Sequence, residues 1–201
     1  NSRGVIMEEA LVEKIKEVLN DPDATTWNNV DTLQFNIIDI MEVDLEMLVL
    51  PFRLLMKYEL HSKFEVNVEI WAKFMLKVKE YMKIDNPYHN FVHIIDVTQT
   101  LSSFLQSPQV AFLTDMDKFT LILASVIHDL DHPGTNNTYQ TNKKTELAVK
   151  YDNKSVLERH HISLAIALFK ETIFNGGTNI DAAQQELILA DVEKLLLSTD
   201  M

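Results

Sequence analysis

Cysteine is absent from the 201-residue chain, so disulfide bonds, thiolate zinc sites, iron–sulfur clusters and cysteine nucleophiles are all excluded. Any metal ion must therefore be held by nitrogen and oxygen atoms. Glycine and proline are scarce, with four and five residues, which leaves little turn chemistry for an all-β sandwich or barrel. Apolar residues make up 46% of the chain, enough for a packed core. We therefore expect an all-α protein.

Basic residues are too few to balance the acidic ones: 18 Lys and Arg stand against 30 Asp and Glu, for a net charge of −12. Nucleic acid and anionic membrane surfaces repel such a chain, so we expect neither as a partner. An anionic substrate would need a strong local positive charge in the site. Because no basic cluster is visible, a bound metal ion is the natural source of that charge.

Long apolar runs are also missing, since none approaches the roughly 18 residues of a membrane span. The first residues do not open a secretion signal. We expect no membrane contact from this segment and a cytoplasmic location, with any membrane anchor in a segment outside it. The chain begins with Asn1 instead of methionine, which we interpret as a piece of a longer protein.

Apolar periodicity and turn signals predict one helical domain over residues 1–201, without internal repeats. The patterns Ser155 to Glu158 and Asp181 to Gln184 look like capping boxes that open helices. We expect the second of these helices to be still running at Met201, a sign that the fold is completed by residues beyond it. Helices are predicted over residues 6–19, 35–41, 46–60, 66–82, 88–105, 116–131, 143–151 and 155–173, and from 181 onward.

Six of the seven histidines fall in three tight groups between residues 89 and 161. His89 and His93 are four residues apart, a spacing that on a helix puts two imidazoles on one face. The ordinary alternative is a pair of half-buried histidines that are satisfied by hydrogen bonds. The second group, His128 to His132, favours a shared site.

His128, Asp129, Asp131 and His132 directly follow the apolar stretch 119–127. Burying adjacent ionisable groups at the end of a core helix costs several kcal/mol unless they are paired or bind a cation. Capping of a helix C-terminus could explain His132, but it cannot account for His128 and both aspartates.

Two imidazoles and a carboxylate suit zinc or a similar transition ion, and a carboxylate with water suits magnesium or manganese. Asp129 can bridge two cations, as in binuclear hydrolases that hold a hydroxide between metals about 3.5 to 4 Å apart for in-line attack on phosphorus. The third group, Glu158 to His161, opens a predicted helix, where Glu158 could serve only as the acceptor of its capping box. These residues predict a metal-dependent phosphoesterase.

Five short motifs follow one another along the chain. They are Tyr88-His89-Asn90-Phe91-Val92-His93 with Asp96-Val97, His128-Asp129-Leu130-Asp131-His132-Pro133-Gly134 with Asn136-Asn137, Glu146-Leu147-Ala148, Ser155-Val156-Leu157-Glu158 with His160-His161, and Ser198-Thr199-Asp200-Met201. In order and spacing they closely resemble the catalytic domain of class I 3′,5′-cyclic nucleotide phosphodiesterases. The resemblance covers roughly residues 25–201 and implies a compact multi-helix, HD-type fold of which this chain is the N-terminal part. The stretch 129–151 is most similar to the high-affinity cGMP-specific branch.

The resemblance implies metal-dependent hydrolysis of a 3′,5′-cyclic nucleotide to the 5′-nucleotide, with cGMP favoured over cAMP. A hydroxide that bridges two metals would attack phosphorus, and His89 matches the general acid that protonates the leaving 3′ oxygen. His93, His128 and Asp129 match the ligands of the tightly held metal, usually zinc. Asp129 also matches the carboxylate that reaches the second ion, usually magnesium or manganese.

The same resemblance assigns further positions. His132, Glu158 and Thr199 match residues that orient the waters of the second ion, and Tyr88 and Met201 match positions that line the nucleotide pocket. The family's fourth metal-ligand aspartate, its purine-binding glutamine and its clamping phenylalanine come from a later segment that this chain does not contain. We therefore expect these 201 residues alone to be inactive. A homodimer is left open as the assembly.

Two other interpretations stay open. The chain could be another HD-type metal phosphohydrolase, which shares the His and His-Asp skeleton but not the segments Tyr88 to Asn90 and Pro133 to Asn137. It could also be a truncated, non-catalytic binding product that pairs its terminal helix with a partner.

Overall fold

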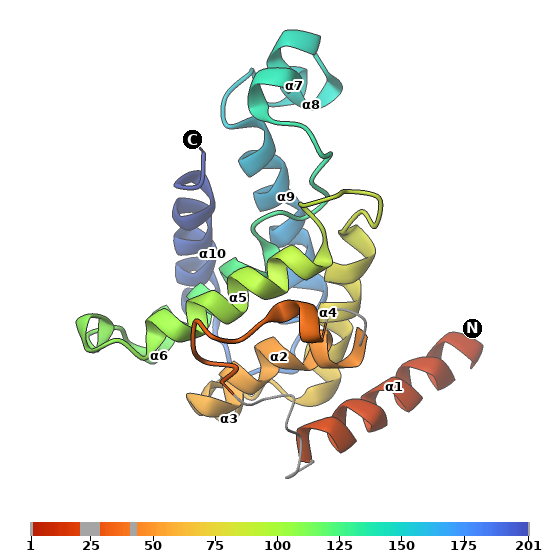
Figure 1. The fold of residues 1–201 in the computed structure, drawn as a ribbon, viewed down its shortest axis with the longest axis vertical. Coiled ribbons are helices and arrows are strands. Elements are labelled where there is room, and N and C mark those ends of the chain that lie inside the picture. Colours follow the sequence, from red (N-terminus) through yellow and green to blue (C-terminus); the bar gives the residue numbers. More distant parts are fainter. Residues whose placement is uncertain (1, 21–28, 41–43, 201) are drawn as a thin grey trace.

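The computed structural model describes residues 2–20, 29–40 and 44–200, and within these ranges every regular element is a helix, so the predicted all-α fold is confirmed (Figure 1). The elements are α1 (Ser2–Asn20), the 3-10 helix η2 (Ile37–Asp39), α2 (Asp44–Lys57), α3 (Leu60–Lys63), α4 (Val68–Tyr81), α5 (Phe91–Leu105), the 3-10 helix η3 (Pro108–Val110), α6 (Asp115–Ile127), α7 (Asn137–Lys143), α8 (Glu146–Lys150), α9 (Val156–Glu171) and α10 (Ala182–Leu197).

Helix α5 crosses the middle of the molecule and packs against α6 and α2 (Figure 1). Helix α10 packs on both α6 and α9, and α1 lies at one edge against α4 and α2. The short helices α7 and α8 project at the far end from α3 (Figure 1). No helix among the described residues is long and apolar enough to cross a membrane.

Aromatic side chains fill the centre of the core. Phe74 on α4 contacts Phe169 on α9 with ring centroids 5.8 Å apart. Phe119 on α6 contacts Phe64, after α3, with ring centroids 4.6 Å apart. These four rings are buried. The first pair joins α4 to α9, and the second joins α6 to the residue that follows α3.

Helix α5 begins at Phe91, three residues later than predicted. Asn90 caps it: the Asn90 side chain accepts a hydrogen bond from the His93 backbone N–H at 3.2 Å, which satisfies one of the free donors of the first turn. His89 therefore lies before the helix. The expectation that His89 and His93 share one helical face is wrong, because the chain changes direction at the cap.

Helix α6 ends at Ile127, four residues earlier than predicted. The N–H of Leu130 donates to the carbonyl of Ile127, and that of His132 donates to the carbonyl of Asp129, so the chain leaves the helix in two successive tight turns. Asp131 has a φ of 56°, a left-handed conformation that aspartate tolerates better than most residues.

Left-handed residues also separate neighbouring helices elsewhere. The predicted helix over 46–60 stops at Lys57, and α3 follows after Glu59, which has a φ of 55°. The predicted helix over 143–151 corresponds to α8, and the helix α7 before it was not predicted. Lys144, with a φ of 49°, ends α7.

The capping box at Asp181 is confirmed, since Asp181 and Gln184 each accept the other's backbone N–H at 2.8 and 2.9 Å. The one predicted at Ser155 is wrong. Ser155 has a left-handed φ of 42° and no side-chain cap bond, and its hydroxyl donates instead to Asp200 at 2.7 Å.

Helix α10 stops at Leu197, so the expectation that it continues to the end of the chain is also wrong for the residues described. The N–H groups of Ser198 and Thr199 donate to carbonyls three residues earlier, Leu195 and Leu196, and close the helix in a final turn. Met201 lies outside the described residues.

We expect Phe119→Ala to lower the free energy of unfolding by about 3 to 5 kcal/mol, because the ring is fully buried against Phe64 and its loss leaves a cavity. Urea unfolding followed by circular dichroism measures this loss. The matched control is Phe112→Ala, since Phe112 is 78% exposed and should change the value by less than about 0.5 kcal/mol. Equal effects of the two variants would contradict the assignment of the core.

Candidate metal centre and surrounding pocket

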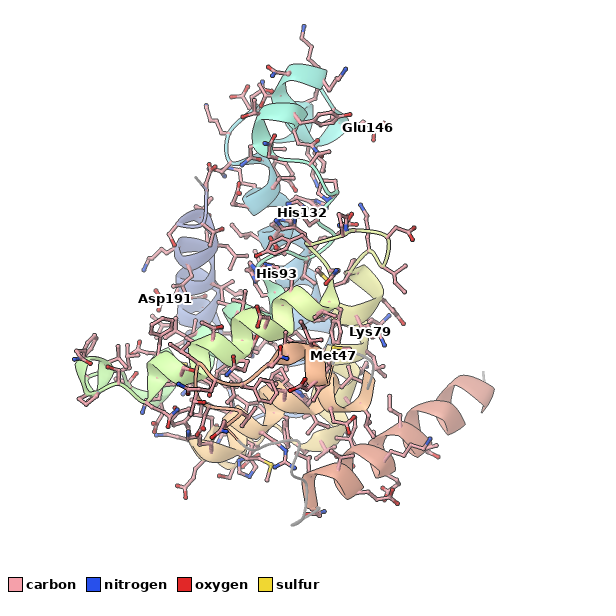
Figure 2. The ribbon with its side chains drawn as sticks, in the orientation of Figure 1. Met47, Lys79, His93, His132, Glu146 and Asp191 are labelled. Carbon is pink, nitrogen blue, oxygen red and sulfur yellow. The ribbon has the colours of Figure 1, made fainter. Side chains whose placement is uncertain are left out.

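A pocket of about 600 Å³ lies where the start of α5, the turns after α6 and the first turn of α9 meet. Figure 2 shows His93 and His132 near one another on this side of α5. Every predicted site residue except Met201, which lies outside the described residues, lines this single pocket: Tyr88, His89, His93, His128, Asp129, His132, Glu158 and Thr199.

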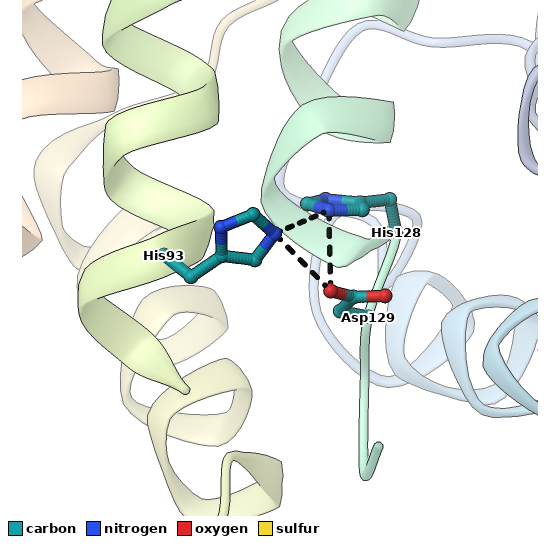
Figure 3. Close-up of side chains that lie close together, drawn as sticks. All are labelled: His93, His128 and Asp129. Atoms are coloured by element: carbon teal, nitrogen blue, oxygen red, sulfur yellow. Dashed lines mark hydrogen bonds and ion pairs between the residues drawn. The ribbon is translucent and has the colours of Figure 1, made fainter. Parts of the chain in front are cut away.

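Three side chains that line the pocket point toward one another (Figure 3). His93 comes from the first turn of α5, His128 is the residue that caps the end of α6, and Asp129 follows it. The His93 Nε2 atom is 3.3 Å from His128 Nε2 and 3.3 Å from Asp129 Oδ2, and the His128 Nε2 atom is 3.4 Å from the same oxygen.

Hydrogen bonding decides which atoms of this cluster carry lone pairs. The His128 Nδ1 atom lies 2.9 Å from the carbonyl oxygen of Ser125, and because a carbonyl only accepts, the proton of the neutral ring sits on Nδ1. The lone pair of His128 Nε2 then faces Asp129 and His93. An ionised carboxylate is also an acceptor only.

Burial and hydrogen bonding have opposite effects on the acid. Burial acts to raise the pKa of Asp129, but in the ion-free chain contacts with the His128 and His93 rings, whose Nε2 atoms donate to the carboxylate when protonated, outweigh it and hold the pKa far below its usual range. The same contact with Asp129 raises the pKa of His128 against the effect of burial. Asp129 is thus ionised in a place where its side chain is only 14% exposed.

The donor set and its spacing fit a zinc ion. Around a tetrahedral ion with bonds of about 2.0 to 2.1 Å, two ligand atoms are separated by about 3.3 to 3.4 Å. The three observed separations fall at this value. Zinc and related transition ions are commonly bound by imidazole nitrogen and carboxylate oxygen, so His93, His128 and Asp129 would hold such an ion without rearrangement.

A second group of metal-binding atoms shares Asp129. The ligand atoms of Asp129, His132 and His161 lie within 4.8 Å of one another. The His161 Nδ1 atom is 2.6 Å from the carbonyl oxygen of Leu130, which places its proton there and leaves a lone pair on Nε2, 3.9 Å from Asp129 Oδ1. Burial lowers the pKa of His161 to about 4, so the ring is neutral near pH 7.

His132 presents the opposite tautomer. The backbone N–H of Gly134 donates to His132 Nδ1 at 3.0 Å, so the proton of the neutral ring is on Nε2. Burial lowers the pKa of this ring to about 4. The alternative interpretation, in which His132 caps the end of α6, is wrong, because α6 already ends at Ile127. Instead the Nε2–H of His132 is a hydrogen-bond donor, which suits a contact with a water or a phosphate oxygen.

The rim of the pocket carries His89 and Tyr88. The His89 ring stacks on the His132 ring, with centroids 3.8 Å apart and an angle of 14°, and burial lowers the pKa of His89. Among the described residues no hydrogen bond reaches the His89 ring, so the alternative of a structurally satisfied histidine does not hold for it. Tyr88 is 62% exposed and its ring lies 4.5 Å from that of His93.

Glu158 is held by an amide and not by a capping box. Asn137 Nδ2 donates to Glu158 Oε2 at 2.9 Å and to Asp200 Oδ1 at 3.1 Å, and Asn137 Oδ1 accepts the Leu157 N–H at 3.0 Å. The alternative that Glu158 serves only its own capping box is therefore contradicted. This network also brings Thr199, next to Asp200, to the pocket wall.

Sequence reasoning gave no role to three residues that shape the site. His161 belongs to one of the motifs quoted above. Its buried position near Asp129 depends on the packing of α9 and cannot be inferred from the spacing of residues in the sequence. Asn137 acts through contacts with residues 21 and 63 positions away. Asp131 holds the turn after α6, because its carboxylate accepts from His160 Nε2 at 2.9 Å and pairs with Lys83 at 3.1 Å.

The sequence that forms this pocket matches a known protein family. Residues 88–201, more than half of the chain and all of the pocket, match the sequence profile of the 3′5′-cyclic nucleotide phosphodiesterases. The chain belongs to this phosphodiesterase family. This match supports the resemblance to the phosphodiesterase catalytic domain that the motifs indicate. It does not support the assignment to the cGMP-specific branch.

Relatives of this chain include the 3′,5′-cyclic-nucleotide phosphodiesterase regA of Dictyostelium discoideum, 36% identical over 183 residues, which are 88% of this chain and 23% of that protein. The dual specificity calcium/calmodulin-dependent 3′,5′-cyclic nucleotide phosphodiesterase 1B of Homo sapiens is 33% identical over 177 residues, 86% of this chain and 33% of that protein. The chain spans a third or less of the length of these two curated relatives.

Among solved structures, the phosphodiesterase domain of the Salpingoeca rosetta rhodopsin phosphodiesterase is similar, with a TM-score of 0.79 and 27% identity. The match covers 93% of this chain and 54% of that chain. The described helices thus correspond to about half of a solved phosphodiesterase domain.

We expect Asp129→Asn to abolish tight binding of a divalent ion in the full-length protein, because it removes the charge shared by both groups of ligand atoms. Metal content after dialysis, measured by mass spectrometry, checks this. Asp191→Asn is the matched control, since Asp191 lies on α10, pairs with Lys194 at the surface and does not line the pocket, so this variant should keep the metal. Retention of metal by Asp129→Asn would contradict the site.

The metal-free protein should lose stability as the pH falls from about 6.5 to about 4. His132 and His161 have pKa values near 4 in the folded chain against 6.5 when exposed, so in this window the unfolded chain binds more protons. Each shift corresponds to at most about 3 kcal/mol, and the raised pKa of His128 acts in the opposite direction.

Urea unfolding of the chelator-treated protein at pH 7 and pH 4.5 measures this dependence. His161→Gln should reduce the difference between the two pH values, because it removes one of the two depressed imidazoles. Equal or greater stability at pH 4.5 would refute the neutral, buried state of these rings.

Proposed function

We propose that the protein hydrolyses a 3′,5′-cyclic nucleotide to the 5′-nucleotide in a metal-dependent reaction. The observation that carries this proposal is the convergence of His93, His128 and Asp129 at ligand spacing inside the segment that matches the phosphodiesterase family. A water oxygen forms the new bond to phosphorus, the bond from phosphorus to O3′ breaks, and O3′ takes up a proton.

His89 is the proposed donor of that proton. Its ring faces the pocket beside the metal-ligand cluster, 5.7 Å from the His93 ring between centroids, and its nitrogens are not engaged elsewhere in the described chain. Because the pKa of His89 is lowered by burial, the protonated ring gives up its proton readily. His132 would donate its Nε2–H to a water or a phosphate oxygen next to it.

We propose that His93, His128 and Asp129 would hold zinc and that Asp129 would also serve as a ligand of magnesium or manganese. When bound, such ions would supply the acidity that makes water a nucleophile. In this assignment His132, Glu158 and Thr199 orient water around the second position. Tyr88 and Met201 would line the nucleotide pocket. The described part of the chain would form a single domain that is the N-terminal portion of the catalytic domain.

We further propose that cGMP is preferred over cAMP. The support is the similarity of residues 129–151 to the cGMP-specific branch. A relative named for dual specificity stands among the matches, so the ratio of kcat/KM for the two nucleotides in the full-length protein is the deciding measurement. A ratio that favours cAMP would overturn the preference while leaving the hydrolysis intact.

The activity itself is tested by incubating the full-length, metal-loaded protein with cGMP, cAMP and deoxynucleoside triphosphates and by quantifying 5′-nucleotide release. Turnover of a cyclic nucleotide that is lost with a chelator supports the proposal. Hydrolysis of triphosphates without turnover of either cyclic nucleotide would point to another HD-type phosphohydrolase and would refute it.

Replacement of His89 by alanine should lower kcat by about 10²- to 10⁴-fold and leave metal content unchanged, because His89 is outside the ligand cluster. Steady-state kinetics together with metal analysis checks this. His61→Gln serves as the control, as His61 lies on α3 away from the three histidine groups and should retain activity. Unchanged turnover in His89→Ala would remove His89 from the reaction.

A further inference from the structure

We propose that Asn86 is a positioning residue that fixes the stacked arrangement of His89 and His132. Its side-chain amide joins the backbone before α5 to the backbone after α6. The inference rests on the proposed function, because it concerns how the proton donor is held over the pocket.

The two contacts of the Asn86 amide are short. Asn86 Nδ2 donates to the carbonyl oxygen of His89 at 2.9 Å and to the carbonyl oxygen of His132 at 2.8 Å. Because both partners are carbonyls, the NH₂ group must face them, and the orientation of the amide is settled. Both N–H groups of the Asn86 amide thus donate to backbone carbonyls, one at His89 and one at His132, and link these two segments of the chain.

The opposite side of the amide is closed by Gly134. A Cβ atom on Gly134 would lie 2.8 Å from Asn86 Oδ1, closer than real contacts allow, so only glycine lets the turn approach this side chain. Gly134 also has a φ of 79°, which favours glycine. The N–H of the same residue donates to His132 Nδ1, so one turn sets both the backbone position and the tautomer of His132.

Asn90 extends the connection to the metal-ligand cluster. Asn90 Nδ2 donates to the backbone carbonyl of Asn86 at 3.0 Å, and Asn90 Oδ1 caps the N–H of His93 at 3.2 Å. The loop over residues 86–90, which contains His89, is therefore hydrogen-bonded through Asn90 to the first turn of α5 and through Asn86 to the turn after α6.

These hydrogen bonds of Asn86 and Asn90 restrict where the His89 ring can lie. This ring has no hydrogen bond within the described residues, so its place is set by the backbone and by ring contacts with Tyr88, His93 and His132, of which the stack on His132 is the shortest, with centroids 3.8 Å apart. A role of Asn86 in forming its own turn would need only its backbone, whose N–H donates to the Lys83 carbonyl. The side chain instead reaches across to a residue 46 positions away, which points to alignment of the two rings.

The test uses Asn86→Asp in the full-length protein. The carboxylate is nearly isosteric but cannot donate, and it repels both carbonyls. We expect kcat for the cyclic nucleotide to fall by about 10- to 100-fold, as for small misplacements of a catalytic group, with KM changed by less than about threefold and the tightly bound metal retained. Asn67→Asp is the control, because Asn67 caps α4 away from the pocket and aspartate caps equally well.

A readout independent of turnover comes from the rings themselves. In protein labelled with ¹³C in the histidine rings, the C–H resonances of His89 and His132 carry the ring-current shift of their stack. Asn86→Asp should move both resonances in the metal-free and the metal-loaded protein. Asn67→Asp should leave them in place.

A second pair of variants tests the same contact if Asn86→Asp does not fold. Gly134→Ala puts a methyl group against Asn86 Oδ1, whereas Gly176→Ala, with nearly the same φ of 78°, meets nothing within 4 Å. The backbone strain is matched, so a shift of the His89 and His132 resonances in Gly134→Ala but not in Gly176→Ala supports the inference.

Unchanged resonances of both rings in Asn86→Asp and in Gly134→Ala would overturn the positioning role, whatever the activity. An equal loss of kcat in Asn86→Asp and Asn67→Asp would also overturn it, as a general effect on stability. If the wild-type protein turned over no cyclic nucleotide, the proposed function would fail, and the resonances would still show whether Asn86 aligns the two rings.

Discussion

A single carboxylate buried among imidazoles is the interaction on which the rest of the site depends. Oδ2 of Asp129 faces His93 and His128, and Oδ1 faces His161. Burial alone would drive such a group toward its neutral form, so its ionised state requires that three separate helices, α5, α6 and α9, hold their histidines within reach. The packing of α5 on α6, and of α10 on both α6 and α9, therefore contributes to the chemistry of the site as well as to the fold.

The tautomers of the surrounding rings follow from backbone contacts and not from the rings' own sequence. Carbonyl oxygens of Ser125 and Leu130 hold protons on the Nδ1 atoms of His128 and His161, so their Nε2 lone pairs face Asp129. The N–H of Gly134 has the reverse effect on His132. Two rings are thus prepared as ligands or acceptors and one as a donor, and the difference is made by which backbone group each ring meets where α6 ends.

Much of this could be predicted from the sequence, and the exceptions have a common cause. The scarcity of glycine and proline predicts the helical fold, and the clustering of His128 and Asp129 after an apolar stretch predicts the metal centre. The ends of the helices were harder, because the Asn90 cap and the left-handed Asp131 override the periodicity that extends through them. Contacts such as that of Asn137 with Glu158 join residues far apart in the chain, and no local pattern encodes them.

The described lining of the pocket has acidic side chains and no basic side chain other than histidine. The acidic side chains are those of Asp129 and Glu158, and burial keeps His132 and His161 neutral near pH 7. The protein side of the pocket is therefore negative, in a chain that already carries a net charge of −12. A cyclic phosphate could not approach such a surface unaided. Cations held by His93, His128 and Asp129 thus have two inseparable roles in the proposed reaction, because the charge that activates water is also the charge that admits the substrate.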